Sequence, residues 1–415
     1  MSNPSDGRIE ITGVRLISLT ALMLLVFAAG IAMPFNITGI VESFAVDNAA
    51  AGLAATVEMA GVAGSSLLFS QLAPRLNPKR VYLVGISAII VLNVATIWAP
   101  TVEVLYIFRA LNGISAGAIV ATVMSTAGRS TAPEATFGVI NSAVGVMGMV
   151  LSLVLPQALK FHGIAPQSLS LSPVDGLFFI YLLFAVLALG FIRSVPVPPP
   201  IEEPEGGGPV EKPKLPFAGW IALFGLGVVF FGHATLAMFI VNVGVEQVQL
   251  SPQTVGFVFM FASAFGIVAP LVAGYVGVRF KAKIPIAVIL MALVVFAFLL
   301  SQASAPIEFY ISGPFFAMMP IALMPIMLGS LARLDPTGRL TGAHPAFVTL
   351  GAAIAPVVGG AVSVTGDYSA NGLLVVGCTA IGAAFFYPAI LIADRKRDEV
   401  GSPLLQPAAE TESPR

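Results

Sequence analysis

Long apolar stretches, separated by short polar segments, make up most of the chain. A transmembrane helix needs roughly 20 apolar residues to cross about 30 Å of hydrocarbon, and twelve stretches have about this length. Because a segment in lipid must satisfy its own backbone hydrogen bonds, each stretch is predicted to form a helix. The predicted spans are residues 14–35, 49–71, 80–100, 102–126, 136–158, 174–194, 217–243, 252–277, 284–302, 308–331, 341–364 and 371–393.

The second half of the chain repeats the landmarks of the first half at one fixed spacing. Membrane carriers are often built from two such related bundles of helices. The predicted fold class is therefore an all-α polytopic membrane protein, with twelve transmembrane helices in two six-helix bundles related by an internal repeat. The residues that match 204 positions apart, without a gap, include Gly52 and Gly256, Arg75 and Arg279, Lys79 and Lys283, Tyr106 and Tyr310, Arg129 and Arg333, and Gly138 and Gly342.

A polar segment divides the two predicted bundles. It is rich in proline, glycine and charged residues, a composition that cannot bury an apolar surface and that is typical of a linker. The predicted organisation is an N-terminus at 1–13, an N-terminal bundle at 14–194, a linker at 195–216, a C-terminal bundle at 217–393 and a tail at 394–415.

Composition and charge indicate the same class of protein and predict its orientation. Hydrophobic residues make up 57% of the chain, charged residues only 10%, and the mean hydropathy is +0.95, which excludes a soluble globular domain. When polar segments are assigned to alternate sides of the membrane, nearly all 20 Lys and Arg residues share the side of both termini. Lys160 falls opposite, and Arg109 lies within a span. Because excess basic residues mark the cytoplasmic side, we expect both termini in the cytoplasm.

Two loops carry a motif of a known family. The loop after the second span reads SQLAPRLNPKR at 70–80, and its repeat reads GYVGVRFKAK at 274–283. Both resemble a loop of the major facilitator superfamily with a pattern near G-x-L-a-D-R-x-G-R-K, whose charges latch helix ends together in one state of the transport cycle. Pro74 and Val278 stand where the family has Asp, and each basic residue is also explained as a positive-inside anchor. The gate positions that the resemblance implies are Arg75, Lys79, Arg279 and Lys283.

Glycine patterns extend this resemblance. Residues 109–117 read RALNGISAG, which is similar to the family's fourth-helix motif, and glycines four residues apart permit close helix contact. The eleventh span resembles the family pattern G-x8-G-x3-G-P-x2-G-G, with Ala355 in place of one glycine. The helix-packing positions implied by the two motifs are Gly113, Gly117, Gly351, Pro356, Gly359 and Gly360.

The resemblance covers about residues 14–394 and implies a secondary transporter of the bacterial twelve-helix type. Such a protein moves a small organic solute across the cytoplasmic (inner) membrane by alternating access, as a monomer surrounded by membrane lipid. Import and export both stay open, because the fifth span lacks most of the glycine pattern associated with exporters. Two alternatives also stay open: an ion-independent facilitator, and a membrane sensor or scaffold that does not transport.

Ionisable residues inside apolar spans are the first candidates for function. Each costs on the order of 2.5–3.5 kcal/mol at mid-membrane by insertion scales. Glu58 and Arg109 lie about nine and seven residues into their spans from the same side, at depths of roughly 14 and 10 Å, so that they can form an ion pair. Two interpretations stay open: Glu58 accepts a coupling proton and Arg109 responds to it or binds an anionic substrate, or the pair statically fixes two helices.

Further polar residues are candidates for a central cavity, although hydrogen bonding between helices explains each equally well. His233 in the seventh span is a candidate for coupling or substrate binding, or a hydrogen-bonded packing histidine. The second half offers little besides His233 to a polar ligand, which favours an amphipathic or aromatic small-molecule substrate. The cavity candidates are Asn93, Asn112, Asn141, Tyr181, Asn242 and Tyr310.

Other classes of function lack the necessary residues. The sequence has no G-x-x-x-x-G-K-[ST] phosphate loop. With three His and one Cys it suggests no clustered metal site, and it contains no basic domain for nucleic acid. We therefore expect no enzymatic activity, no cofactor and no nucleic-acid partner, and we expect a proton as the coupling ion if coupling occurs.

Overall fold

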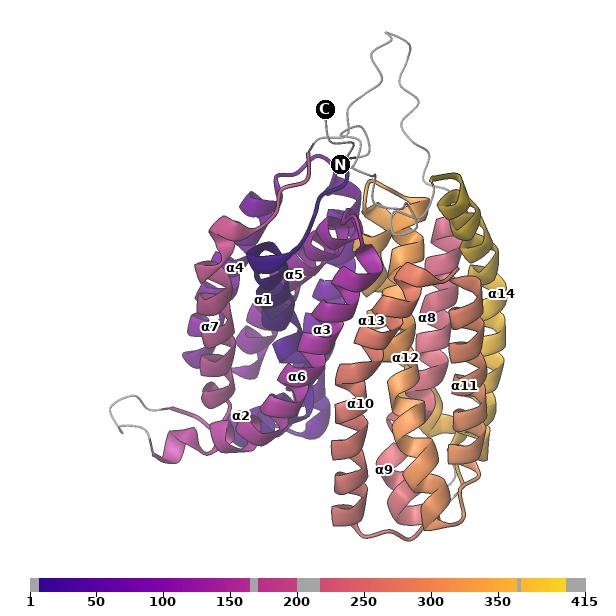
Figure 1. Cartoon of the computed structure of the whole chain (residues 1–415). Helices are drawn as coiled ribbons and strands as arrows, with labels where there is room; N and C mark the ends of the chain where they lie inside the picture. The colour runs from indigo at the N-terminus through magenta and orange to yellow at the C-terminus, as the bar shows by residue number, and fades with distance from the viewer. Residues whose placement is uncertain (1–6, 165–170, 200–216, 364–366, 401–415) are drawn as a thin grey trace, which may run out of the picture.

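The computed structural model describes residues 7–164, 171–199, 217–363 and 367–400 (Figure 1). Most of the predicted linker and of the predicted tail therefore lies outside the described residues. The helices of the first half are α1 (Gly13–Ile31), α2 (Met33–Phe44), α3 (Asn48–Leu72), α4 (Pro78–Ile97), α5 (Val102–Gly128), α6 (Pro133–Leu159) and α7 (Asp175–Gly190), followed by the short 3-10 helix η4 (Ile192–Ser194).

The second half repeats this order of helices. Its elements are α8 (Phe217–Ala237), α9 (Ile240–Asn242), the π-helix η5 (Val243–Gln247), α10 (Pro252–Arg279), α11 (Lys283–Ser301), α12 (Pro306–Leu334), α13 (Arg339–Val362) and α14 (Ser369–Val400). Within the described part of the chain, ten helices are long and apolar enough to cross a membrane, and shorter apolar helices cover 175–190 and 264–279. The predicted all-α fold of two related bundles is confirmed.

Three spans differ from their predicted course. The first bends at Ala32, between α1 and α2, because Pro34 in the first turn of α2 has no N–H to continue the hydrogen-bond ladder, and the helix then runs on to Phe44. The seventh breaks after Ala237 and ends in η5. The twelfth continues beyond residue 393 to Val400.

The extension of α14 is held by the ends of α10 and α11. The Asp394 carboxylate accepts hydrogen bonds from the backbone N–H groups of Ala282 and Lys283, at 2.8 and 3.0 Å, at the start of α11. Arg397 donates to carbonyl oxygens at the end of α10, including that of Gly277 at 3.1 Å. These groups satisfy helix-end donors and acceptors that have no partner within their own helices. A segment that hydropathy places in a polar tail is therefore part of the folded bundle.

The two halves stand side by side and meet along three helices of each half (Figure 1). From the first half, α3 and α5 pack against α13, and α6 packs against α10 and α12. The contact is close because a Cβ atom at Gly138 would lie only 2.7 Å from the carbonyl oxygen of Pro270. Its repeat partner Gly342 occupies the corresponding place, where a Cβ atom would lie 2.9 Å from the carbonyl oxygen of Ala121. The repeat thus preserves glycine where the bundles touch.

Candidate functional site

Glu58 and Arg109 meet inside the first bundle, as their predicted depths require. Glu58 lies on α3 and Arg109 on α5, and both side chains are almost fully buried, at 3 and 2% exposure. Arg109 Nη1 lies 3.7 Å from Glu58 Oε1, and the Asn112 amide donates to the same oxygen at 2.7 Å. Removing either partner would leave a buried charge without compensation, which is strongly unfavourable.

Glycine brings the two helices of this pair together. At Gly113 on α5, a Cβ atom would overlap the backbone carbonyl oxygen of Glu58. One turn further along, a Cβ atom at Gly117 would lie 2.4 Å or less from Val62 and Ser65 of α3. These two glycines, which the sequence assigns to helix packing, therefore determine the separation between the helices that carry Glu58 and Arg109.

Polar groups of α4 bind the arginine from its other side. Arg109 Nη2 donates at 3.0 Å both to Asn93 Oδ1 and to Thr96 Oγ1. Asn93 in turn lies 3.4 Å from Asn112 Oδ1, and the guanidinium carbon of Arg109 lies 4.9 Å from the centre of the Phe178 ring. Two of the predicted cavity residues, Asn93 and Asn112, thus belong to one network around the charged pair.

A small internal cavity lies next to the carboxylate. It has a volume of about 20 Å³, and its polar lining residues are Glu58, Asn93, Asn112 and Tyr181. A site of this size with several polar neighbours can hold about one water molecule. Tyr181 donates from its hydroxyl to Asn36 Oδ1 at 2.8 Å, which connects the cavity wall to α2. Asn36 is a member of the network that the sequence analysis did not include, because it falls at the predicted end of the first span.

The remaining candidates do not join this network. His233 on α8 stacks on the ring of Phe316, with ring centres 4.5 Å apart, and its Nε2 has no hydrogen-bond partner among the described residues. Asn141 donates to the carbonyl oxygen of Phe137 in its own helix at 2.8 Å. Asn242 donates to Glu246 at 2.8 Å, and Tyr310 is exposed.

A second buried ion pair connects the two bundles. Glu134 at the start of α6 contacts Arg333 at the end of α12, with side-chain exposures of 3 and 14%. Two glycines of the second bundle make room for the carboxylate, because a Cβ atom at Gly277 would lie 2.9 Å from Glu134 Cγ and one at Gly329 would overlap its carboxyl group. This pair was not predicted, because the positive-inside rule is enough to explain Arg333. The signal that could have indicated the pair is Glu134, an acidic residue in a loop on the side of the membrane that carries the basic residues.

A related set of charges lies beside this pair. Burial lowers the pKa of the Arg129 guanidinium, and the negative charge of Asp335 opposes that shift. Arg129 also donates to the carbonyl oxygens of Gly7 and Pro199, at 2.8 and 2.5 Å. Asp335 accepts from the backbone N–H of Leu340 at 2.9 Å and so caps the start of α13. Arg129 and Arg333 are repeat partners, and both therefore face a carboxylate of the opposite bundle.

The sequence model of the Major Facilitator Superfamily matches residues 18–336. The chain belongs to the major facilitator superfamily. No curated protein sequence matches it. Among solved structures, the E. coli fucose:proton symporter FucP and a FucP structure in the outward conformation both give a TM-score of 0.70 at 12% identity, covering 90 and 91% of this chain and 98% of theirs.

Two further structures show the same fold. The proton:xylose symporter XylE, bound to 6-bromo-6-deoxy-D-glucose, gives a TM-score of 0.64 at 14% identity and covers 90% of this chain and 96% of its own. A bacterial homologue of the iron transporter ferroportin, in an outward-facing state, gives 0.66 at 13% identity, with coverages of 91 and 99%. The protein is thus an integral membrane protein with the transporter fold of this superfamily.

The superfamily gate positions are not brought together. Arg75 is exposed, and the Lys79 ammonium donates to the carbonyl oxygen of Arg193 at 3.1 Å within the first half. The guanidinium of Arg279 lies 4.2 Å from the centre of the Tyr275 ring on its own helix. Lys283 donates from its backbone N–H to Asp394. Among the described residues, Glu134 and Arg333 instead form an ion pair between the bundles.

The glycine pattern of the eleventh span packs α13 against α8. Cβ atoms at Gly351 and Gly359 would each lie 2.6 Å from a backbone carbonyl oxygen of α8. Gly360 faces the Phe239 ring with room for an ordinary contact, and Pro356 is exposed. Close packing therefore requires glycine at Gly351 and Gly359.

Proposed function

We propose that the protein is a secondary active transporter that moves a small organic solute by alternating access, coupled to protons through Glu58. The observation that carries the proposal is the buried contact of Glu58 with Arg109. Groups of this kind within membrane helices are costly, and they usually serve ion or substrate movement.

The hydrogen bonds around the pair support two distinct charge states. With Glu58 ionised, its charge is compensated by Arg109 and by the Asn112 amide. When Glu58 takes up a proton, Arg109 loses its counter-ion and keeps only the neutral acceptors Asn93 and Thr96. A change of protonation therefore alters the balance of charge within the network. This gives the proton a physical means of biasing the helices or of releasing Arg109 to an anionic group.

The contacts between the bundles support alternating access. Several contacts between the bundles lie in the half of each helix that is nearer the chain termini. They are made at Glu134, Gly138, Ser142, Gly145 and Gly342. Glu58 and Arg109 lie in the other half of theirs. With the termini in the cytoplasm, as the basic residues favour, this arrangement corresponds to an outward-facing state that is closed on the cytoplasmic side.

Features of the second bundle favour an amphipathic or aromatic solute. His233 and Phe316 of α12 stack face to face, and α12 supplies further apolar side chains to the hydrophobic core that contains Phe316. We propose that the protein works as a monomer in a bacterial inner membrane. The fucose and xylose symporters, to which the fold is similar, are proton symporters by name, which supports proton coupling as the mechanism here.

A ligand screen tests the proposal. Thermal unfolding of the purified protein is measured with a library of metabolites and drugs at several pH values, in the wild type and in Glu58→Gln, because a ligand that binds the folded state raises its stability. We expect a ligand whose stabilising effect depends on pH in the wild type only. A ligand whose effect is the same at every pH in both proteins would contradict proton coupling and favour an ion-independent facilitator.

A further inference from the structure

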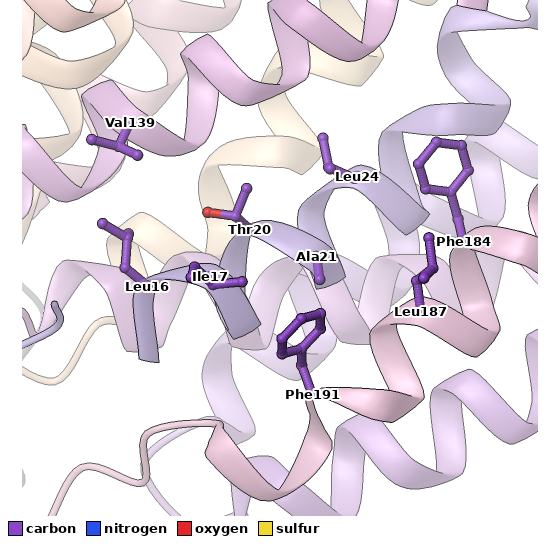
Figure 2. A pocket seen from close by; sticks show the side chains of 9 residues that line it. All are labelled: Leu16, Ile17, Thr20, Ala21, Leu24, Val139, Phe184, Leu187 and Phe191. Atoms are coloured by element: carbon purple, nitrogen blue, oxygen red, sulfur yellow. The ribbon is translucent and has the colours of Figure 1, made fainter. Parts of the chain in front are cut away.

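An apolar groove lies on the surface of the first bundle, away from the charged network. It encloses about 340 Å³, within the range of roughly 300–1,000 Å³ that is typical of ligand sites. Helix α1 forms its floor, and α6 and α7 form its walls, with Val139 on one side and Phe184 and Phe191 on the other (Figure 2). Thr20 is the one polar side chain among the nine that line it.

The groove has the length of one lipid leaflet. Its floor runs from Leu16 to Leu24, which corresponds to about 12 Å along a helix, and half of the hydrocarbon thickness is about 15 Å. Several lining side chains are exposed, including Ile17 at 52% and Leu187 at 49%, so the groove opens outward from the bundle. In a membrane protein this opening faces lipid.

Basic side chains lie at the end of the groove nearer the chain termini. Arg15 directly precedes Leu16 on α1, and Arg193 follows Phe191 by two residues in η4, which packs against α1. Both arginines are exposed. Arg15 donates to the backbone carbonyl oxygen of Glu10, a neutral acceptor that does not compensate the charge of the arginine. Lys79 adds a further positive charge, because its ammonium group binds the carbonyl oxygen of Arg193.

We propose that this groove binds one acyl chain of an anionic phospholipid, with its phosphate near Arg15 and Arg193. The apolar length matches an acyl chain in one leaflet, and the position of the arginines matches the headgroup level of the same leaflet. Basic pockets between membrane helices on the cytoplasmic side attract anionic headgroups, and each basic residue near the surface strengthens binding roughly fivefold. The groove is therefore expected to prefer an anionic phospholipid over a phospholipid without net charge.

Native mass spectrometry of the full-length protein tests the headgroup. Dioleoyl phosphatidylglycerol and dioleoyl phosphatidylcholine are titrated separately into the detergent-solubilised protein. We expect the anionic lipid to bind first, and we expect Arg15→Gln with Arg193→Gln to weaken its binding about 25-fold without changing the binding of phosphatidylcholine. Arg395→Gln, which removes an exposed charge of the second half, should retain the preference. Equal binding of the two lipids to the wild type, or a preference that survives in the double variant, would overturn the proposal.

A second variant tests the groove itself. Ala21→Phe places a ring between α1 and α7 and should weaken the binding of both lipids. Soluble glycerophosphoglycerol, which has the headgroup without acyl chains, should not compete. Undiminished lipid binding in a folded Ala21→Phe protein, or full competition by the soluble headgroup, would place the lipid outside the groove. The arginine variants change exposed side chains only, so the test does not depend on the folding of Ala21→Phe.

Discussion

Neutralising Glu134 should open the contact between the bundles on the side of the termini. In Glu134→Gln, Arg333 keeps its charge at the interface but loses the carboxylate that it contacts. Removing one partner of a buried pair costs about 3–5 kcal/mol. Since the Arg333 side chain is 14% exposed, water can partly solvate it, and the lower end of that range, about 3 kcal/mol, applies.

This cost falls on the closed state, because opening lets water reach the arginine. A change of about 3 kcal/mol alters the ratio of closed to open molecules by about 150-fold. A protein that is almost entirely closed as wild type would therefore show a measurable open population as Glu134→Gln. Arg333→Gln, which leaves the buried Glu134 carboxylate without its counter-ion, should shift the ratio in the same direction. The double variant leaves neither charge unpaired and should lie closer to the wild type than either single variant.

Distances between spin labels measure this population. Labels are attached to cysteines at Arg75 and Arg395, two exposed positions on the same side of the molecule in opposite halves, in a Cys378→Ser background. Double electron–electron resonance should give one dominant distance between the labels in the wild type and an additional longer distance in Glu134→Gln. Glu103→Gln, which removes an exposed carboxylate at the far end of α5, is the matched control. Identical distance distributions in the wild type and Glu134→Gln would show that the glycine contacts alone hold the bundles closed.

Two further predictions concern stability. Gly113→Ala should force α3 away from α5, which lowers the apparent melting temperature, at a cost of about 1–3 kcal/mol, and weakens the contact of Glu58 with Arg109. Gly377→Ala is the control, because a Cβ atom there meets nothing within 4 Å. Equal melting temperatures for the two variants would refute the packing argument. Arg397→Gln should also lower the melting temperature, because hydrogen bonds to a charged group contribute about 1.5–3 kcal/mol. Arg395→Gln, which changes an exposed side chain, should leave the melting temperature unchanged. A wild-type melting temperature in Arg397→Gln would contradict the role of the α14 extension.

Much of the fold follows from the sequence because the length and hydropathy of a segment predict most membrane helices. The contact of Glu58 with Arg109 also follows, since both depths can be counted along helices that start on the same side. The partners Asn93 and Asn112 are recognisable as polar residues within spans, but the sequence does not show that they bind the arginine.

Features that depend on contacts between distant helices could not be predicted. The Glu134 contact with Arg333 requires that α6 and α12 lie side by side, which no local pattern encodes. The π-helix at 243–247 is held by tertiary hydrogen bonds, such as that from Gln247 to the carbonyl oxygen of Ala303 at 2.8 Å. The end of α14 is helical for the same reason, because its charged residues bind the ends of neighbouring helices.

The most direct test of the central claim is a comparison of proton movement with solute exchange in proteoliposomes, using a ligand from the thermal screen. The account predicts that the wild type acidifies or alkalinises the lumen as the solute moves, as a trapped pH dye reports. Glu58→Gln should lose this signal and the accumulation driven by a pH gradient, while exchange of labelled for unlabelled solute continues. Proton movement in Glu58→Gln that equals that of the wild type would contradict the assignment of coupling to Glu58.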